Sequence, residues 1–287
     1  MKPAAFEYVR PASLNEALQA LARHGSAGKI LAGGQSLVPM MNLRFARPEV
    51  VIDINRLPGL DHIRFANGML AIGALARHSA LHDSPLVALH CPLMSEAYRH
   101  VAHKPIRNRG TLGGNLSHAD PASEMPAVLL AVNAKLGMQS TRGVRELAAD
   151  DFFQSQLQTA LAADELLTEI RIPAAAPTQG WAFEEESTRK GDFAMAAVAV
   201  TLDISAGICR QVAIAVAGMG ARAVRLGAVE AGLAGKPLDD AAITRAALQA
   251  WQTVTPDGSF HADAEFKRDL IQALAARALK RALARCK

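Results

Sequence analysis

The chain has 287 residues, of which 50% are hydrophobic and 20% are charged, so it can bury one or two globular cores. A net charge of +4 with only 5% aromatic residues argues against a nucleic-acid binder, which combines clustered cations with stacking rings. Three widely spaced cysteines give neither a disulfide framework nor a metal knuckle, and no apolar run is long enough for a signal peptide or a membrane span. We therefore expect a cytoplasmic protein with no transmembrane segment.

The first sixty residues predict a small α/β unit. Ser13 and Glu16 form a capping box, an apolar stripe follows at helical spacing, and Gly25 is placed to end that helix. The stretch "KILAGG" then reads as a short buried strand that runs into the pair Gly33–Gly34. A second strand, "VVIDI", covers residues 50–54.

The pattern stays mixed to about residue 173. Strands are expected at "MLAIGALA", "AKLGMQS" and "LLTEIRIP", and helices at residues 92–102 and 127–131. A second glycine-rich loop, "RNRGTLGGNLSHADPASEMP", lies between those two helices. The proline-bearing stretch at residues 173–180 is the best candidate for a linker.

In the last third of the chain the predicted elements change from alternating helices and strands to two strands followed by helices. "MAAVAVTLDI" and "QVAIAVAGM" alternate as antiparallel strands joined through Ala206–Gly207, and helical patterns follow at residues 222–233, 239–251 and 264–284. Strands followed by helices favour a separate α+β domain.

Two loops carry the double glycine, "AGGQS" at residues 32–36 and "TLGGN" at residues 111–115. Glycine lets backbone N–H groups point into a concave nest that suits phosphate oxygens, and the neighbouring hydroxyl and amide side chains add neutral donors. Tight turns explain most such loops taken singly. Two of them fit a diphosphate gripped from two sides.

Other motifs have simpler interpretations. Gly218-x-Gly220-x-x-Ala223 nearly matches a dinucleotide fingerprint, but no second buried strand delivers Asp239 and Asp240, so we interpret the glycines as turn residues. The pairs His78/His82 and His100/His103 lack a completing ligand and are interpreted as helix-surface histidines. The basic C-terminal helix is interpreted as a packed helix with a solvated face, and partner docking is the minority alternative.

Taken together, the segments resemble the flavoprotein (medium) subunit of the molybdenum hydroxylases, the group that contains carbon monoxide dehydrogenase, xanthine dehydrogenase and bacterial N-heterocycle dehydrogenases. The resemblance covers nearly the whole chain, in the family's order and spacing. It is carried by "FEYVRPASLNEAL", "LAGGQSLVPMMNLR", "VIDINRLPGL", "IRNRGTLGGNLSHADPASEMPA", "ELLTEIRIP", "RKGDFA" and "EFKRDLIQALAARAL".

The resemblance implies an α+β chain with a vanillyl-alcohol-oxidase-like (PCMH-type) FAD domain over residues 1–176 and an α+β C-terminal domain over residues 177–287. The FAD domain would comprise two α/β subdomains of about 1–57 and 58–176. The two glycine loops would close on the FAD pyrophosphate and ribityl chain. The matching positions are Ile30, Leu31, Ala32, Gly33, Gly34, Gln35, Ser36 and Leu37 in the first loop, and Thr111, Gly113, Gly114 and Asn115 in the second.

Five further positions follow from the resemblance. Val101 would lie near the adenine side and Leu167 against the flavin edge. Glu124 stands where relatives often have an aspartate for sugar or adenine contacts, and Phe193 where they often have a tyrosine beside the isoalloxazine. Relatives commonly place a lysine in the first half of "FEEESTRKGD", near the flavin pyrimidine, where this chain has Glu184–Glu186; Arg189 or Lys190 are the candidates to supply that charge.

The resemblance implies an electron-transfer role. Substrate would be oxidised at a molybdopterin cofactor on a large subunit, and electrons would pass through two [2Fe–2S] clusters on a small subunit to FAD on this chain and then to an external acceptor. We expect a dimer of such heterotrimers, no catalytic acid or base on this chain and no metal. The alternatives are a stand-alone FAD-dependent oxidase of the same fold class, a nucleotide-responsive binding subunit, and a nicotinamide-dependent dehydrogenase built on Gly218 and Gly220.

Overall fold

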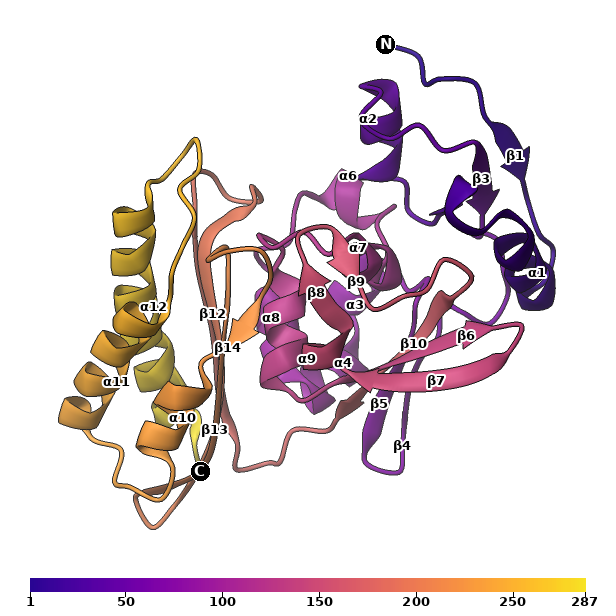
Figure 1. Cartoon of the computed structure of the whole chain (residues 1–287). Coiled ribbons are helices and arrows are strands. Elements are labelled where there is room, and N and C mark those ends of the chain that lie inside the picture. Colours follow the sequence, from indigo (N-terminus) through magenta and orange to yellow (C-terminus); the bar gives the residue numbers. More distant parts are fainter.

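The computed structural model describes the whole chain, residues 1–287. Figure 1 shows a small N-terminal unit and a C-terminal unit of sheet and helices on opposite sides of a middle unit. No helix combines the length and the apolar character needed to cross a membrane.

The N-terminal unit is a parallel three-stranded sheet in the order β1-β3-β2, covered by helix α1. The Ser13 hydroxyl accepts a 3.2 Å hydrogen bond from Glu16 N, and Gly25 ends the helix with φ of +51°, so both predicted helix boundaries are confirmed. The elements are β1 (Glu7–Val9), α1 (Leu14–His24), the 3-10 turn η1 (Gly25–Ala27), β2 (Gly28–Leu31), α2 (Leu37–Asn42) and β3 (Val50–Asp53).

The middle unit is an antiparallel five-stranded sheet in the order β4-β5-β10-β6-β7, with short helices packed on it around a large apolar cluster. Its strands are β4 (Ile63–Ala66), β5 (Met69–Gly73), β6 (Lys135–Ser140), β7 (Gly143–Ala148), the small pair β8 (Phe153–Ser155) and β9 (Gln158–Thr159), and β10 (Leu166–Pro173). Its helices are α3 (His78–His82), α4 (Pro85–His90), α5 (Pro92–Ala97), α6 (Lys104–Arg107), α7 (Leu112–His118), α8 (Glu124–Ala131) and α9 (Ala149–Phe152).

One predicted helix of this unit is too long. The expected helix over 92–102 ends as α5 at Ala97. A continuous helix to residue 102 is excluded because Ala102 takes a left-handed φ of +43°, and the separate helix α6 follows with Pro105 in its first turn. The break places residues 98–103 in an irregular segment between α5 and α6.

The C-terminal unit has an antiparallel sheet in the order β11-β12-β13-β14, and α8 of the middle unit contacts β12, β13 and β14. The predicted hairpin of β12 and β13 through Ala206–Gly207 is confirmed, and both turn residues have positive φ. The elements are β11 (Gly180–Ser187), β12 (Ala194–Ser205), β13 (Ile208–Ala217), β14 (Val224–Arg225), α10 (Gly227–Leu233), α11 (Asp240–Thr253) and α12 (Ala264–Arg285).

The sheet direction excludes the dinucleotide fingerprint. Gly218 and Gly220 follow β13, which pairs antiparallel with both neighbours, and Asp239 caps helix α11 by accepting a hydrogen bond from Ala242 N. A nicotinamide site built on these glycines would need a parallel sheet. Both glycines are turn residues with positive φ, as predicted.

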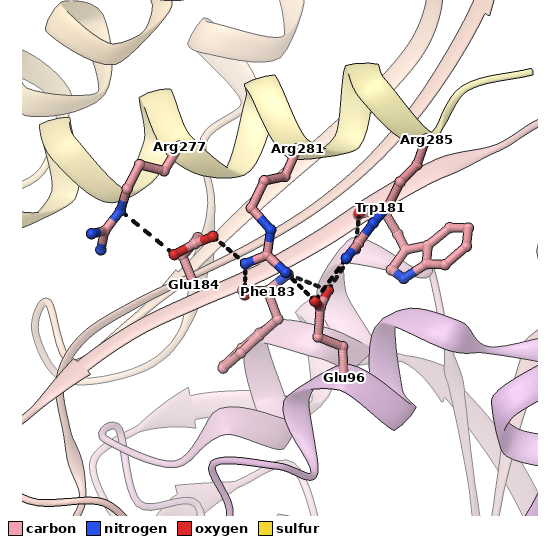
Figure 2. A network of polar contacts seen from close by, with 7 residues as sticks. All are labelled: Glu96, Trp181, Phe183, Glu184, Arg277, Arg281 and Arg285. Atoms are coloured by element: carbon pink, nitrogen blue, oxygen red, sulfur yellow. Dashed lines mark hydrogen bonds and ion pairs between the residues drawn. The ribbon is translucent and has the colours of Figure 1, made fainter.

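Helix α12 contacts both the C-terminal sheet and the middle unit and so links the two. Arg281 and Arg285 bind the carboxylate of Glu96 on α5, with Arg285 Nη1 at 2.8 Å from Glu96 Oε2, and Arg281 also binds Glu184 on β11 (Figure 2). The expectation of a simply solvated basic face is therefore wrong for these arginines. Their partners lie far away in the sequence and become neighbours only in the fold.

Candidate functional site

The two glycine loops, far apart in the sequence, touch in the structure. A Cβ atom added to Gly33 would collide with the Arg109 carbonyl oxygen and lie 2.7 Å from Gly110 Cα, just before the second loop. A Cβ on Gly114 would lie 3.6 Å from Ala32 Cβ. The loops thus approach each other at backbone distance, which only glycine permits at Gly33.

The first loop offers a row of unbonded donors. The backbone N–H groups of residues 33–37 donate to no other protein group, and Gly34 has a positive φ of +75°. The Gln35 side chain donates instead to the Gly33 carbonyl at 3.1 Å. Consecutive free N–H groups in such a turn form an anion-binding nest.

The second loop is built more tightly. Thr111 caps α7 by accepting a hydrogen bond from Gly114 N at 3.1 Å, and Gly113 N donates to Ala74 O at 2.8 Å. A Cβ on Gly113 would lie 2.6 Å from that same Ala74 oxygen, so this glycine is required by close packing against the turn that follows β5. The Asn115 amide exchanges hydrogen bonds with the Ser123 hydroxyl, at 2.8 and 3.1 Å.

Two polar residues that the sequence analysis missed connect the loops. The Asn55 side-chain amide donates to the carbonyls of Leu31, at 3.3 Å, and Ala32, and Arg77 donates both to Asn55 Oδ1, at 3.0 Å, and to the Arg109 carbonyl. The chain Leu31–Asn55–Arg77–Arg109 therefore joins the first loop to the start of the second.

His78 also supports the second loop, and its predicted place on a helix surface is wrong. The residue is buried, its ring lies 3.2 Å from the Tyr98 hydroxyl, and its backbone N–H donates to Gly110 O at 3.1 Å. Burial, followed by the charges of Arg107 and Arg77, lowers the pKa of His78 to about 4, so the ring is neutral at physiological pH. No three His, Cys, Asp or Glu side chains gather as metal ligands anywhere in the chain.

The other predicted residues of the middle unit lie near the second loop in different ways. Val101 and Leu167 are buried in the same apolar cluster as Leu112 of α7. Glu124 opens α8, directly after the Ser123 that binds Asn115, and is buried. Burial, with a smaller contribution from the charge of Asp120, raises the pKa of Glu124 to about 7.

The loop between β11 and β12 brings the C-terminal unit to this region. Ala194 N donates to Ala122 O at 3.3 Å, which places the preceding Phe193 beside the segment that leads to Glu124. The Phe193 side chain is 62% exposed and Lys190 is also exposed, so neither covers a buried surface of this chain.

Because side chains alternate along a strand, the neighbouring glutamates Glu184 and Glu185 lie on opposite faces of β11. Glu184 points toward α12, where it binds Arg277, at 3.5 Å, and Arg281, and it therefore does not supply a charge to the loops. The Glu185 side chain points the other way. It is 1% exposed, its Oε2 has no hydrogen-bond partner, and its Oε1 lies 3.8 Å from His100 Nδ1.

These features fit a flavin dinucleotide. The glycine contacts allow a ligand to approach the backbone, and the free N–H groups at residues 33–37 match diphosphate oxygens. On β11 of the C-terminal unit, the buried Glu185 Oε2 has no hydrogen-bond partner within the chain. The structure brings the two predicted loops together, whereas the roles of the individual residues toward the cofactor stay predictions.

Comparisons with known proteins agree with this geometry. Residues 4–175 match the family model of the FAD binding domain in molybdopterin dehydrogenase, and residues 181–282 match that of the CO dehydrogenase flavoprotein C-terminal domain.

Relatives and solved structures cover the whole chain. The caffeine dehydrogenase subunit beta of Pseudomonas sp. (strain CBB1) is 42% identical over 98% of this chain and 96% of its own. The 6-hydroxypseudooxynicotine dehydrogenase complex subunit alpha of Paenarthrobacter nicotinovorans is 41% identical over 100% of this chain and 97% of its own. A chain of the carbon monoxide dehydrogenase from Hydrogenophaga pseudoflava, solved in a form that lacks the Mo-pyranopterin moiety of the molybdenum cofactor, superimposes with a TM-score of 0.98 at 40% identity and full coverage of both chains. The chain therefore belongs to the family of FAD-binding medium subunits of the molybdenum hydroxylases, which are oxidoreductase subunits.

Proposed function

We propose that this chain holds FAD and transfers electrons within a molybdenum hydroxylase, from [2Fe–2S] clusters of a partner subunit to an external acceptor. The observation that carries the proposal is the meeting of the two glycine loops, with Gly33 against Arg109–Gly110 and a row of free N–H groups beside it.

The cofactor-binding residues that we propose come from all three units. The N–H groups of the first loop bind the diphosphate, Thr111 and Asn115 supply neutral polar contacts, and Val101 and Leu167 give apolar cover. The full set is Ile30, Leu31, Ala32, Gly33, Gly34, Gln35, Ser36, Leu37, Val101, Thr111, Gly113, Gly114, Asn115, Glu124, Leu167, Lys190 and Phe193.

FAD, when bound, supplies redox chemistry in one- and two-electron steps. This chain's own task is to orient the cofactor, to exclude water from its buried side and to leave one edge accessible to the acceptor. We assign no general acid or base on an organic substrate, because that chemistry belongs to the molybdenum subunit.

We further propose partners and boundaries. The names of the relatives, a "complex subunit alpha" and a "subunit beta", support assembly with a large molybdenum subunit and a small iron–sulfur subunit, and we propose a cytoplasmic dimer of such heterotrimers. The FAD-binding domain would span residues 1–176, with subdomains of about 1–57 and 58–176, and the C-terminal domain residues 177–287.

The first experiment measures flavin uptake. The purified wild-type chain is expected to be yellow with a two-banded flavin spectrum, and Gly33→Ala is expected to lose the cofactor, because its Cβ forces the Arg109 carbonyl away and separates the loops. Gly227→Ala is the matched control, since a Cβ there meets nothing within 4 Å. A colourless wild type that ignores added FAD, or a Gly33→Ala chain as yellow as the control, contradicts the assignment.

The second experiment tests electron transfer. The FAD-loaded chain is mixed with the reduced iron–sulfur subunit of its own complex, and flavin bleaching is followed at the visible flavin bands in a stopped-flow instrument. Reduction on the timescale of turnover supports the proposal. A flavin that stays oxidised in the assembled complex while the clusters are reduced refutes it.

A further inference from the structure

A second candidate site lies beside the irregular segment between α5 and α6. It is a pocket of about 390 Å³ whose lining is almost entirely basic. Only one of its lining residues is apolar, and none is acidic. The lining consists of His82, Arg99, Ala102, His103, Lys104, Arg107 and Lys190. These residues come from α3, the α5–α6 segment, α6 and the β11–β12 loop, so the pocket joins the middle and C-terminal units.

The cations of this pocket lack ion-pair partners. Arg99, Lys104, Arg107 and Lys190 have no carboxylate oxygen within 4.0 Å, whereas Arg281 and Arg285 of the same chain are paired. One acid lies near the pocket without lining it: the hydrogen bond with His82, at 2.7 Å, lowers the pKa of Asp83, and the charges of Lys104 and Arg107 lower it further. Four like charges around one concavity concentrate a positive potential that attracts anions.

Two contacts hold these cations in place. Arg107 Nη1 donates to the carbonyls of Val101, at 2.9 Å, and Ala102, at 2.8 Å, which fixes its guanidinium group while its other N–H groups stay free. Gly191, with φ of +89°, docks against His103: a Cβ there would lie 2.6 Å from His103 Cε1. That close approach keeps the neighbouring Lys190 at the rim of the pocket.

We propose that this basic pocket binds a phosphate-bearing small molecule beside FAD, with Lys190, which we also assign to the cofactor, at the boundary between the two sites. A cavity of this size lies in the range of small-molecule sites, whereas an acidic protein partner would need roughly 800 Å² of matching surface. Arginine and lysine side chains give charge-assisted hydrogen bonds to phosphate oxygens, while the loop at residues 33–37 offers neutral backbone donors. The two places therefore recognise anions by different chemistry.

The test uses the full chain saturated with FAD and inorganic pyrophosphate as the probe, followed by isothermal titration calorimetry. The double variant Arg99→Glu/Lys104→Glu is expected to bind pyrophosphate at least about tenfold more weakly, with its flavin absorbance per protein unchanged. Arg64→Glu/Arg210→Glu, which makes the same change in net charge at exposed positions on β4 and β13, is expected to bind pyrophosphate like the wild type.

Three outcomes overturn the proposal: no pyrophosphate binding to the FAD-loaded chain, equal weakening in both double variants, or binding to FAD-free protein that added FAD displaces. The last outcome would assign the pocket to the cofactor itself. A chain that takes up no FAD but binds pyrophosphate through Arg99 and Lys104 would refute the proposed function and leave the pocket assigned.

Discussion

Glu185 is an acid in a place where ionisation is unfavourable. Its carboxyl is almost fully buried, and one oxygen has no hydrogen-bond partner. Burial, and then the charges of Glu124 and Glu186, raise the pKa of Glu185 to about 8, while burial lowers the pKa of the neighbouring His100. Both groups are therefore neutral near pH 7, and their 3.8 Å approach is not an ion pair under those conditions.

A pH dependence of stability follows from this raised pKa. Between pH 4.5, the ordinary value for a glutamate, and about 8, the folded chain keeps a proton that the unfolded chain releases, so rising pH lowers the free energy of unfolding. Glu185→Gln removes this penalty. The free energy of unfolding of the variant minus that of the wild type is expected to be on the order of 2–4 kcal/mol larger at pH 8.5 than at pH 5.5. Urea unfolding at the two pH values measures this difference.

Glu49→Gln, a change at an exposed glutamate, provides the control and is expected to give the same difference from the wild type at both pH values. A Glu185→Gln chain whose stability relative to the wild type stays constant across this range would show that the carboxyl is ionised in the folded state. In that case the buried oxygen has a partner that compensates its charge.

The glycine loops are the elements that the sequence predicted best. A double glycine records a local backbone requirement, so Gly33 and Gly114 could be identified without knowing their neighbours, and their contact confirmed that the two loops converge. Asn55 and Arg77 gave no such signal, because an asparagine after a strand or an arginine in a loop is usually solvated. Their hydrogen-bond partners lie 22 to 32 residues away in the sequence and become neighbours only in the fold.

Asn55 and Arg77 give a prediction at the scale of the loops. Asn55→Ala removes the hydrogen bonds to the Leu31 and Ala32 carbonyls and the acceptor for Arg77, so the first loop loses its link to the second. We expect FAD to bind about tenfold more weakly, as one charge-assisted hydrogen bond is worth roughly 1.5–3 kcal/mol. Fluorescence titration of FAD-free protein measures the effect.

Asn108→Ala is the matched comparison, since the Asn108 side chain is exposed and makes no hydrogen bond within the chain. If both asparagine variants bind FAD with wild-type affinity, the loops are positioned by the glycine contacts alone. Circular dichroism of each variant separates a local loss from unfolding.

At the scale of the molecule, the sequence showed the order of the units but not how they are fastened together. The apolar stripe of α12 was predictable from its spacing, yet the same pattern suggested a solvated basic face. Glu96 instead binds two of those arginines across the boundary. Burial opposes its ionisation, but the hydrogen bond and charge of Arg285, the Phe183 N–H and the charge of Arg281 outweigh burial and lower the pKa of Glu96.

This pairing predicts a measurable contribution to stability. Arg285→Met removes a cation that binds Glu96 Oε2 at 2.8 Å and the Trp181 carbonyl at 2.7 Å, leaving a nearly buried carboxylate with one arginine fewer. We expect a loss on the order of 1–3 kcal/mol in urea unfolding at pH 7. Because the pKa of Glu96 is lowered, the loss shrinks as pH falls through that lowered value and the carboxyl takes up a proton.

Lys280→Met serves as the comparison on the same helix. Its ion pair with Asp240, at 3.0 Å, joins two exposed side chains and is expected to contribute less than about 1 kcal/mol. Equal losses in the two variants would mean that the Glu96 cluster (Figure 2) is no stronger than an ordinary surface pair.

The partners of Glu96 stand 185 and 189 positions after it, at the end of the chain. During translation the middle unit leaves the ribosome long before Arg281 and Arg285 are synthesised, so Glu96 on α5 has no arginine partner during that interval. Helix α12 can pair with Glu96 only once Arg281 and Arg285 have themselves left the ribosome. The boundary between the two units therefore gains these ion pairs late in synthesis, and a chain truncated before Arg281 would lack both of them.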